Sequence, residues 1–150
     1  MKGKKIIDSC IGKSLNTGKI QSFVLNGELI DKINVTFLKF DNWIKIVSTD
    51  EITTVENEDN SFDKINSYGD DEFYYPIEKI EIEFSDFKKY KGKRLLKWKE
   101  LVWKNDSNMS YGINLYFEND LNLIIHNETI PDDKNKYIFE NNLPKDLEEK

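Results

Sequence analysis

Short runs in which apolar and polar residues alternate recur along most of this 150-residue chain, and they constrain its fold more than any other feature. Residues 111–128, YGINLYFENDLNLIIHNE, contain two such runs separated by the polar break END. A period of two places successive side chains on opposite faces of an extended strand. The stretch therefore predicts a β-hairpin with one apolar row on each strand. These rows are Ile113, Leu115 and Phe117, and then Leu121, Leu123 and Ile125.

Similar patterns predict strands in the first third of the chain. The dipeptide Asp41-Asn42 interrupts the alternation, and both residues tolerate the positive φ of a tight turn. A hairpin turn is therefore expected there. The predicted strands are residues 19–26, 29–40 and 43–49, and residues 52–55 either extend the last strand or begin another.

Residues 76–84, PIEKIEIEF, alternate cleanly. The pattern places Ile80, Ile82 and Phe84 on one face and predicts a strand. The opposite face would then carry acidic side chains that could pair with lysines of the next strand. The residues of these expected pairs are Glu81 and Glu83 on one strand, and Lys97 and Lys99 on the other.

Residues 93–104, KRLLKWKELVWK, fit a strand whose alternation slips near Glu100, which indicates a β-bulge. Helical spacing of apolar residues is the competing interpretation of this segment. Two tryptophans, Trp98 and Trp103, and the lack of a helix-capping residue at Gly92 favour the strand.

Three segments depart from the extended pattern. Residues 4–11 have apolar residues at helical spacing before Gly12, and they predict one short helix. Residues 56–72, ENEDNSFDKINSYGDDE, lack periodicity and predict a long acidic loop. Residues 140–150 predict a frayed C-terminal tail with a helical turn.

Together these elements predict a mainly β fold of the α+β class in a single domain, residues 1–150. We expect one short N-terminal helix and a strongly twisted antiparallel sheet of six to eight strands that forms a partial barrel or sandwich. Aromatic residues make up 13% of the chain, and their large side chains can build a core although only 38% of residues are hydrophobic. Trp43, Trp98 and Trp103 are expected to be core or rim residues.

The formal net charge of −6 disfavours a nucleic-acid binder, because phosphate contacts require lysine and arginine. Residues 50–86 contain thirteen acidic and two basic side chains, whereas residues 87–104 contain one acidic and eight basic ones. The acidic stretch is either a solvated loop or a docking patch for a basic partner, with aromatic residues as apolar anchors. The candidate partner-binding residues are Glu58, Asp59, Asp63, Asp70, Asp71, Glu72, Tyr74 and Tyr75.

The chain offers few residues for catalysis or metal binding. His126 is its only histidine and Cys10 its only cysteine, so neither a nucleophilic pair nor a zinc site is indicated. We expect His126 to be a surface residue of the predicted hairpin. The acidic run 56–63 has oxygen ligands at alternate positions but lacks the glycine and the final glutamate of a regular EF-hand loop. The sequence thus predicts a protein that is not an enzyme and uses no metal or cofactor.

A single cysteine excludes an intrachain disulfide, which fits a reducing cytoplasm. The basic start of the chain precedes an apolar stretch that is too short for a signal peptide, and no segment reaches the roughly 20 apolar residues of a membrane span. We therefore expect a cytoplasmic protein without a membrane partner. It would be a monomer or a homodimer formed through edge strands.

Residues 40–51, FDNWIKIVSTDE, and residues 112–128, GINLYFENDLNLIIHNE, resemble segments of small, acidic, β-rich bacterial immunity proteins of polymorphic or contact-dependent toxin systems. In those families a strand of the type G-I-x-L-x-F leads through a polar turn to L-x-I-x-N. The matching residues here are Gly112, Ile113, Leu115, Phe117, Leu123, Ile125 and Asn127. The resemblance implies an immunity protein that binds and inhibits a cognate toxin protein. If that toxin is a nuclease, the acidic loop would mimic phosphates.

Two other functions remain open from the sequence. One is a small-ligand-binding β-barrel module, in which Trp43, Trp98 and Tyr116 would line the pocket. The other is an enzyme, which would require a pair of carboxylates with perturbed pKa values in a cleft. The first would need an interior that is not filled by side chains, and the second would need carboxylates that converge.

Overall fold

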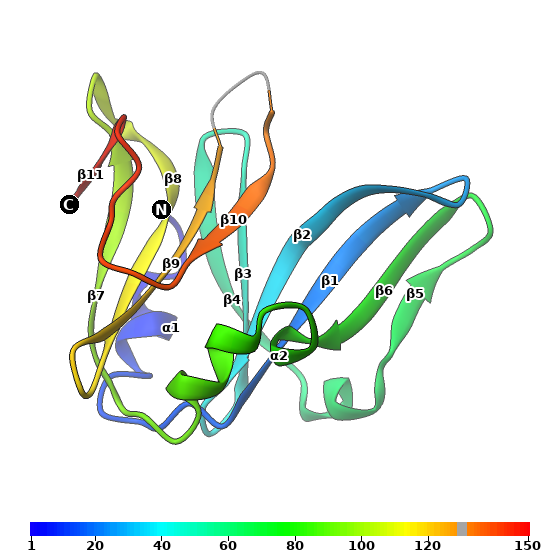
Figure 1. Ribbon diagram of the computed structural model, residues 1–150, viewed down its shortest axis with the longest axis horizontal. Coiled ribbons are helices and arrows are strands. Elements are labelled where there is room, and N and C mark those ends of the chain that lie inside the picture. Colours follow the sequence, from blue (N-terminus) through cyan, green and yellow to red (C-terminus); the bar gives the residue numbers. More distant parts are fainter. Residues whose placement is uncertain (129–131) are drawn as a thin grey trace.

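Two antiparallel β-sheets form the body of the protein in the computed structural model (Figure 1). The structure describes residues 1–128 and 132–150, and eleven strands occur within those residues. The mainly β, α+β fold class predicted from the alternation is therefore confirmed. The strands outnumber the six to eight expected, and over the described residues the sheets do not close into a barrel.

The first sheet has six strands in the order β4-β3-β2-β1-β6-β5. Their bounds are β1 Thr17–Leu25, β2 Glu28–Lys39, β3 Trp43–Thr49, β4 Ile52–Glu58, β5 Ser67–Gly69 and β6 Phe73–Lys79. Strands β1 to β4 are consecutive hairpins, as the alternation predicts. Asp50 and Glu51 both have positive φ, 50° and 62°, and form a tight turn. This turn makes β4 a strand of its own and not an extension of β3.

The second sheet has five strands in the order β10-β9-β8-β7-β11. Their bounds are β7 Leu95–Trp103, β8 Asp106–Phe117, β9 Leu121–Asn127, β10 Asn135–Ile138 and β11 Leu147–Glu149. The predicted β8–β9 hairpin is confirmed, since Ile113 pairs with Ile125 and Leu115 with Leu123. Strand β7 is confirmed as well, and its register is irregular between Leu101 and Trp103, next to the predicted bulge.

The main hydrophobic core contains side chains of both sheets. Ile20 and Leu38 enter it from the first sheet, and Leu115 and Leu123 from the second. Smaller clusters cover the outer face of each sheet, one around Trp43 and one around Tyr111. Trp43 is fully buried, whereas Trp98 and Trp103 are partly buried at cluster edges, so all three are core or rim residues as predicted.

The helices are short. Helix α1 spans Lys4–Asp8, as predicted near the N-terminus, and its Ile7 is buried in the main core. Ile7 is buried because α1 packs beside β4. Among the described residues, no helix is long and apolar enough to cross a membrane.

The strand predicted over residues 76–84 is wrong in its second half. Strand β6 ends at Lys79, and helix α2 (Ile80–Glu83) and the 3₁₀ helix η2 (Ser85–Tyr90) follow. Ile80 is fully buried but Ile82 is 67% exposed, so the two side chains do not share a face. The apolar residues that pack are Ile80, Phe84 and Phe87, whose spacing of four and then three is helical.

The ion pairs expected for that strand are also wrong. Glu81 pairs with Lys91 at 2.9 Å, and Glu83 pairs with Lys32 at 3.0 Å. Neither carboxylate meets the lysines of β7, because the chain turns into α2 before it reaches that strand. The two ion pairs instead attach α2 to its neighbours in β2 and the turn after η2.

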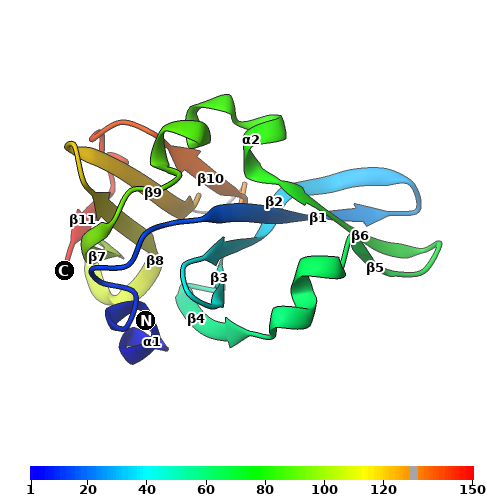
Figure 2. The same cartoon turned by 90° about the horizontal axis from the view of Figure 1, so that it is seen from below.

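Residues 56–72 are not one irregular loop. Strand β4 continues to Glu58, a 3₁₀ helix, η1, spans Asn60–Lys64, and β5 follows. Phe62 of η1 is fully buried, with its ring centroid 4.2 Å from that of Phe37 and 5.2 Å from that of Trp43. The buried ring of Phe62 therefore packs this polar segment against the outer face of the first sheet. Figure 2 shows η1 and α2 on opposite sides of β1.

The C-terminal residues 140–150 are not a frayed helical tail. Residues Leu147–Glu149 form β11, which pairs with β7 and adds an edge strand to the second sheet. Leu147 is buried in the outer cluster of that sheet. Backbone pairing with β7 outweighs the polar composition of the segment.

Candidate partner-binding arm

Parts of four strands of the first sheet, β1, β2, β5 and β6, extend past the region where the two sheets pack together and form a projecting arm (Figures 1 and 2). We define the arm as residues 22–32 of the β1–β2 hairpin and residues 67–75 of β5 and β6. Strand β3 pairs with β2 only at residues 36–39, so within the described chain the arm portion of β2 pairs with β1 alone. Toward its base, the β2 side of the arm borders Phe84 and β10, with which residues 29–33 line a cavity.

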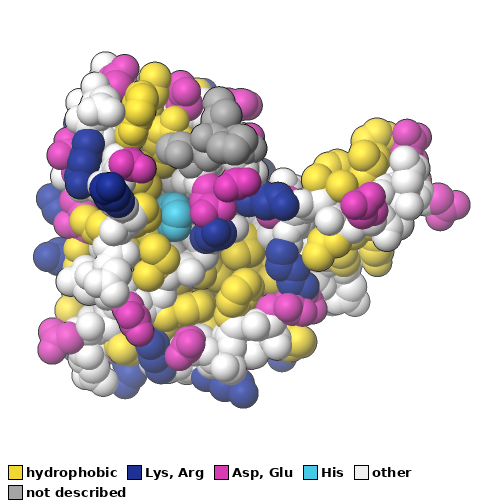
Figure 3. Space-filling view, turned by 45° about the horizontal axis from the view of Figure 1, so that its top comes forward, with side chains coloured by type: hydrophobic (Ala, Val, Ile, Leu, Met, Phe, Trp, Pro, Cys, Tyr) yellow, Lys and Arg dark blue, Asp and Glu magenta, His cyan; other side chains and the backbone are white. Residues whose placement is uncertain are grey.

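Large apolar side chains are concentrated on this arm. Of the ten large hydrophobic side chains that are exposed in the described residues, five belong to it: Leu29, Ile30, Tyr68, Phe73 and Tyr74. Figure 3 shows hydrophobic side chains along the arm and acidic ones near its end. Exposed apolar surface on this scale marks interaction sites in proteins that are otherwise polar outside. The arm is thus the best candidate for a docking surface.

The strand alternation divides these residues between two faces. Phe73, Tyr75 and Ile77 lie on the face of β6 that continues into the Trp43 cluster, and Tyr74 lies on the opposite face. The ring of Phe23 stacks beside those of Tyr75 and Phe73, at centroid distances of 5.2 and 6.5 Å. An aromatic row therefore leads from the buried cluster toward the end of the arm.

Three of the predicted acidic residues form the turn at the end of the arm. Asp70 Oδ1 accepts the backbone N–H groups of Phe73 at 2.8 Å and Glu72 at 3.0 Å. These two hydrogen bonds lower the pKa of Asp70. Asp71 and Glu72 take part in no ion pair within the described residues. Asp70 thus holds the turn, while the charges of Asp71 and Glu72 remain available to a partner.

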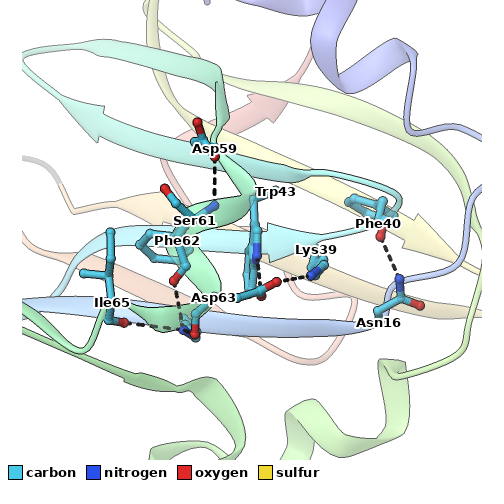
Figure 4. A network of polar contacts seen from close by, with 10 residues as sticks. Asn16, Lys39, Phe40, Trp43, Asp59, Ser61, Phe62, Asp63 and Ile65 are labelled. Carbon is cyan, nitrogen blue, oxygen red and sulfur yellow. Dashed lines mark hydrogen bonds and ion pairs between the residues drawn. The ribbon is translucent and has the colours of Figure 1, made fainter.

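Asp63, at the base of the arm, has internal partners (Figure 4). It accepts hydrogen bonds from Lys39 Nζ at 2.7 Å and from Trp43 Nε1 at 2.8 Å, and the bond from Lys39 is the main cause of its lowered pKa. Lys19 of β1 donates to the carbonyl oxygens of Phe62 at 3.3 Å and Asp63 at 3.2 Å. This network fastens η1 to the sheet, so Asp63 has a structural role.

Asp59 and Glu58 lie at the start of the same segment. Asp59 caps η1, because its Oδ1 accepts the backbone N–H of Ser61 at 2.8 Å. Glu58 Oε1 accepts the backbone N–H of Asp59 at 3.1 Å. Burial, and then the charge of Glu58, raise the pKa of Tyr68.

The structure therefore separates the predicted partner-binding residues into two groups. Asp70, Asp71 and Glu72 lie at the end of the arm, beside Tyr74 and Tyr75. Glu58, Asp59 and Asp63 lie at its base, where each accepts at least one hydrogen bond from the chain itself.

Sequence reasoning missed the contribution of the β1–β2 hairpin to this surface. Phe23, Leu29 and Ile30 belong to it, and the last two are exposed close to the turn at Gly27. A signal was present in the sequence. Apolar residues occupy consecutive positions on both sides of Asn26-Gly27, although hairpin ends that face only water are normally polar.

The prediction that His126 is a surface residue is wrong. It is 6% exposed, and burial lowers its pKa. Its register partners are Gly112 on β8 and Lys136 on β10, so it occupies an inner strand that is flanked on both sides. Cys10 is buried in the main core, and no contact joins it to His126 among the described residues.

The three aromatic residues proposed to line a ligand pocket are not brought together. Trp43 packs against Phe62 on the outer face of the first sheet. Trp98 donates its indole N–H to Asp8 at 2.8 Å, and Tyr116 donates its hydroxyl to Glu149. In the part of the chain that the structure describes, no group of three or more His, Cys, Asp or Glu residues could hold a metal ion.

The residues that match the G-I-x-L-x-F and L-x-I-x-N pattern of immunity proteins form the β8–β9 hairpin, and residues 40–51 of the resemblance contain β3. Ile113, Leu115, Leu123 and Ile125 are buried in the main core. They specify how the second sheet packs and do not contribute to the arm. No protein-family model, curated protein or solved structure matches this chain.

Proposed function

We propose that this protein binds and inhibits a toxin protein, as immunity proteins do, and that the arm is its docking surface. The observation that carries the proposal is the concentration of exposed apolar side chains on a projecting sheet that ends in an acidic turn. The apolar side chains would supply buried contact area, and Asp71 and Glu72 would steer the arm toward a basic surface.

The size and shape of the arm support insertion into a cleft. A stable protein interface uses about 20–30 residues on each side, and the arm supplies roughly 20. Because both faces carry apolar side chains, a cleft that holds the arm would bury Tyr74 and Leu29 as well as Phe73. In a nuclease toxin the acidic turn would take the place of substrate phosphates in the basic cleft.

The proposal includes inhibition by binding, without catalysis or a cofactor, in the cytoplasm. Cys10 is free and buried, so the fold needs no oxidising compartment. The ion pair of Asp63 with Lys39 and the hydrogen bonds that Glu58 and Asp59 accept suit a rigid base for the arm better than a second contact region. The alternative, a small-ligand-binding module, was expected to use Trp43, Trp98 and Tyr116 as pocket residues. These three side chains contact different partners and do not line a common pocket.

The first test is affinity capture from the source cells with the tagged protein and two variants. Leu29→Ser/Tyr74→Ser removes apolar contacts from the arm at exposed positions. Leu96→Ser makes a similar change on β7, where the side chain is 52% exposed, and serves as the matched control. A docking partner is captured in stoichiometric amount by the wild-type protein and by the control, but not by the arm variant.

The second test asks whether binding neutralises the partner. The captured protein is expressed from an inducible promoter in a bacterial host, alone and together with each variant. The proposal expects growth arrest that is relieved by the wild-type protein and by Leu96→Ser, and not by Leu29→Ser/Tyr74→Ser. A partner that is harmless to the host would overturn inhibition of a toxin. Equal capture by all variants would instead remove the arm as the docking surface.

A further inference from the structure

The outer strand of the arm, β5, lacks the features that normally protect the edge of a sheet. It is the last strand of the first sheet, and within residues 1–128 and 132–150 it pairs only with β6 (Figure 1). Its residues are Ser67, Tyr68 and Gly69, and all three are exposed. None of them is charged or a proline, although charges, prolines and bulges are what usually keep an edge from pairing with another chain.

The other sheet edges of the described chain are covered, irregular or charged. Lys2 lies along β4, where its backbone forms hydrogen bonds with Thr53 at 2.8 Å and Val55 at 3.1 Å. The arm portion of β2 has register shifts in its pairing with β1, next to Phe23. Strand β10 packs beside β2, and β11, with the sequence LEE, is acidic. The contrast makes β5 the edge that is best suited to receive another strand, and this edge belongs to the arm.

The hydrogen bonds between β5 and β6 show which backbone groups face outward. The carbonyl oxygen of Asn66 accepts a hydrogen bond from β6 at 2.8 Å, and the N–H of Asp70 donates one to β6 at 2.9 Å. In a planar trans peptide unit the C=O of one residue and the N–H of the next point in opposite directions. The N–H of Ser67 and the C=O of Gly69 therefore point away from β6.

Strand alternation directs the C=O of Ser67 and the N–H of Gly69 to the same outward side. These backbone groups can receive a further strand, as in complexes where an extended peptide adds to an open sheet edge. A strand of three residues offers few such bonds, so side chains next to the edge must contribute to affinity as well. Both faces of β5 offer them.

Tyr68 extends the aromatic row of the arm to this edge. It pairs with Tyr75, whose ring centroid lies 5.2 Å from that of Phe23, and its own side chain is 42% exposed. A strand added beside β5 would place one side chain next to Tyr68, where aromatic and β-branched residues form the most favourable cross-strand pairs. On the opposite face Gly69 has no side chain, so the exposed ring of its partner Tyr74 is open to the added strand.

The acidic turn determines which charge the added strand can carry at its end. Strand β5 leads directly into Asp70, Asp71 and Glu72. The last two form no ion pair with the described part of the chain. A lysine or arginine at the end of the added strand would meet these carboxylates, whereas an acidic residue would be repelled.

We propose that the toxin held by the arm contributes an extended segment, which pairs with β5 as an additional strand of the first sheet. The segment places an aromatic or β-branched side chain beside Tyr68 and a basic side chain beside the acidic turn. This inference rests on the proposed function and specifies how the partner is bound.

A matched pair of variants at Ser67 tests the backbone contact, with the captured toxin as the ligand in a calorimetric titration. Ser67→Pro removes the outward N–H and leaves the hydrogen bonds between β5 and β6 in place, whereas Ser67→Ala removes only the hydroxyl. The proline variant should bind at least about tenfold more weakly, because it loses a hydrogen bond and its ring obstructs the added strand. The alanine variant should bind within about twofold of the wild-type protein. Unchanged urea midpoints show that both variants are folded.

Amide hydrogen exchange of the wild-type protein, followed by NMR, tests the pairing without any substitution. In the free protein the amides of Ser67 and Gly69 should exchange fast, and in the toxin complex both should slow about a hundredfold. Fast exchange of both amides in the complex, or full-strength binding by Ser67→Pro, would overturn strand addition while toxin inhibition stands. Slow exchange of both amides in the concentrated free protein would assign the edge to a second copy of this chain and would also overturn it. Failure to capture any toxin would overturn the proposed function and this inference together.

Discussion

Protonation of Glu100 should destabilise this protein over a defined range of acid pH. The carboxylate is 5% exposed and lies 2.7 Å from the Met1 ammonium and 2.8 Å from Lys4 Nζ. Burial by itself raises its pKa, but the contacts with Lys4 and the Met1 ammonium outweigh burial and lower the pKa to about 2. A pKa that is lower in the folded state contributes stability above the unfolded-state pKa, and this contribution is lost as the pH falls toward the folded-state value.

The magnitude follows from the size of the shift. The pKa falls from 4.5 to about 2 on folding, and each unit corresponds to about 1.4 kcal/mol, so the full contribution is about 3 kcal/mol. At pH 3 the unfolded carboxylate is mostly protonated while the folded one is still mostly ionised, so about 2 kcal/mol should already be lost. A Glu100→Gln variant lacks this titration.

Urea unfolding of untagged wild-type protein and Glu100→Gln at pH 6 and pH 3 isolates the effect. Other carboxylates titrate equally in both proteins, so their contributions cancel in the difference between the two free energies of unfolding. That difference should shrink by about 2 kcal/mol between pH 6 and pH 3. A difference that stays constant would refute the ion-pair explanation and show that Glu100 stabilises the fold only through packing.

Four further variants have expected outcomes that urea unfolding or binding can measure. Phe62→Ala should cost about 3–5 kcal/mol, because the ring is fully buried, while Ile82→Ala, at 67% exposure, should cost less than about 0.5 kcal/mol. Gly112→Ala should cost at least about 2 kcal/mol, because the added Cβ would lie 2.2 Å from a backbone oxygen of β9. Asp71→Lys/Glu72→Lys should leave stability within about 0.5 kcal/mol but slow association with a basic partner, and the difference should fade as salt is raised.

The main hairpins of the protein could be predicted because their signal is local. Where one face of a strand is buried and the other is exposed, residues two apart in the sequence are buried or exposed together. Ile113, Leu115 and Phe117 follow this rule, because all three are buried in the main core. The same logic failed at residues 80–84, where a period of two and a spacing of four both fit Ile80 and Phe84. Extending the window to Phe87 resolves the ambiguity, since only a helix places all three on one side.

Polar composition was a poor guide to the segments that look like loops. Residues 56–72 carry few apolar side chains, yet Phe62 packs against the sheet, and the carboxylate of Asp63 accepts hydrogen bonds from Lys39 and Trp43. These partners are about 20 residues or more away in the sequence, so no local window contains the interaction. The C-terminal β11 is a similar case, because its stability comes from pairing with β7.

The sequence by itself determined the β-rich class, the order of the hairpins and the faces on which their side chains lie. Only the tertiary structure decided which faces are covered. Burial of His126 between β8 and β10, and exposure of Leu29 and Tyr74 on the arm, follow from whether another strand or helix packs there. The alternation of a strand specifies which side chains share a face, but the free energy of burying that face depends on neighbours that are distant in the chain.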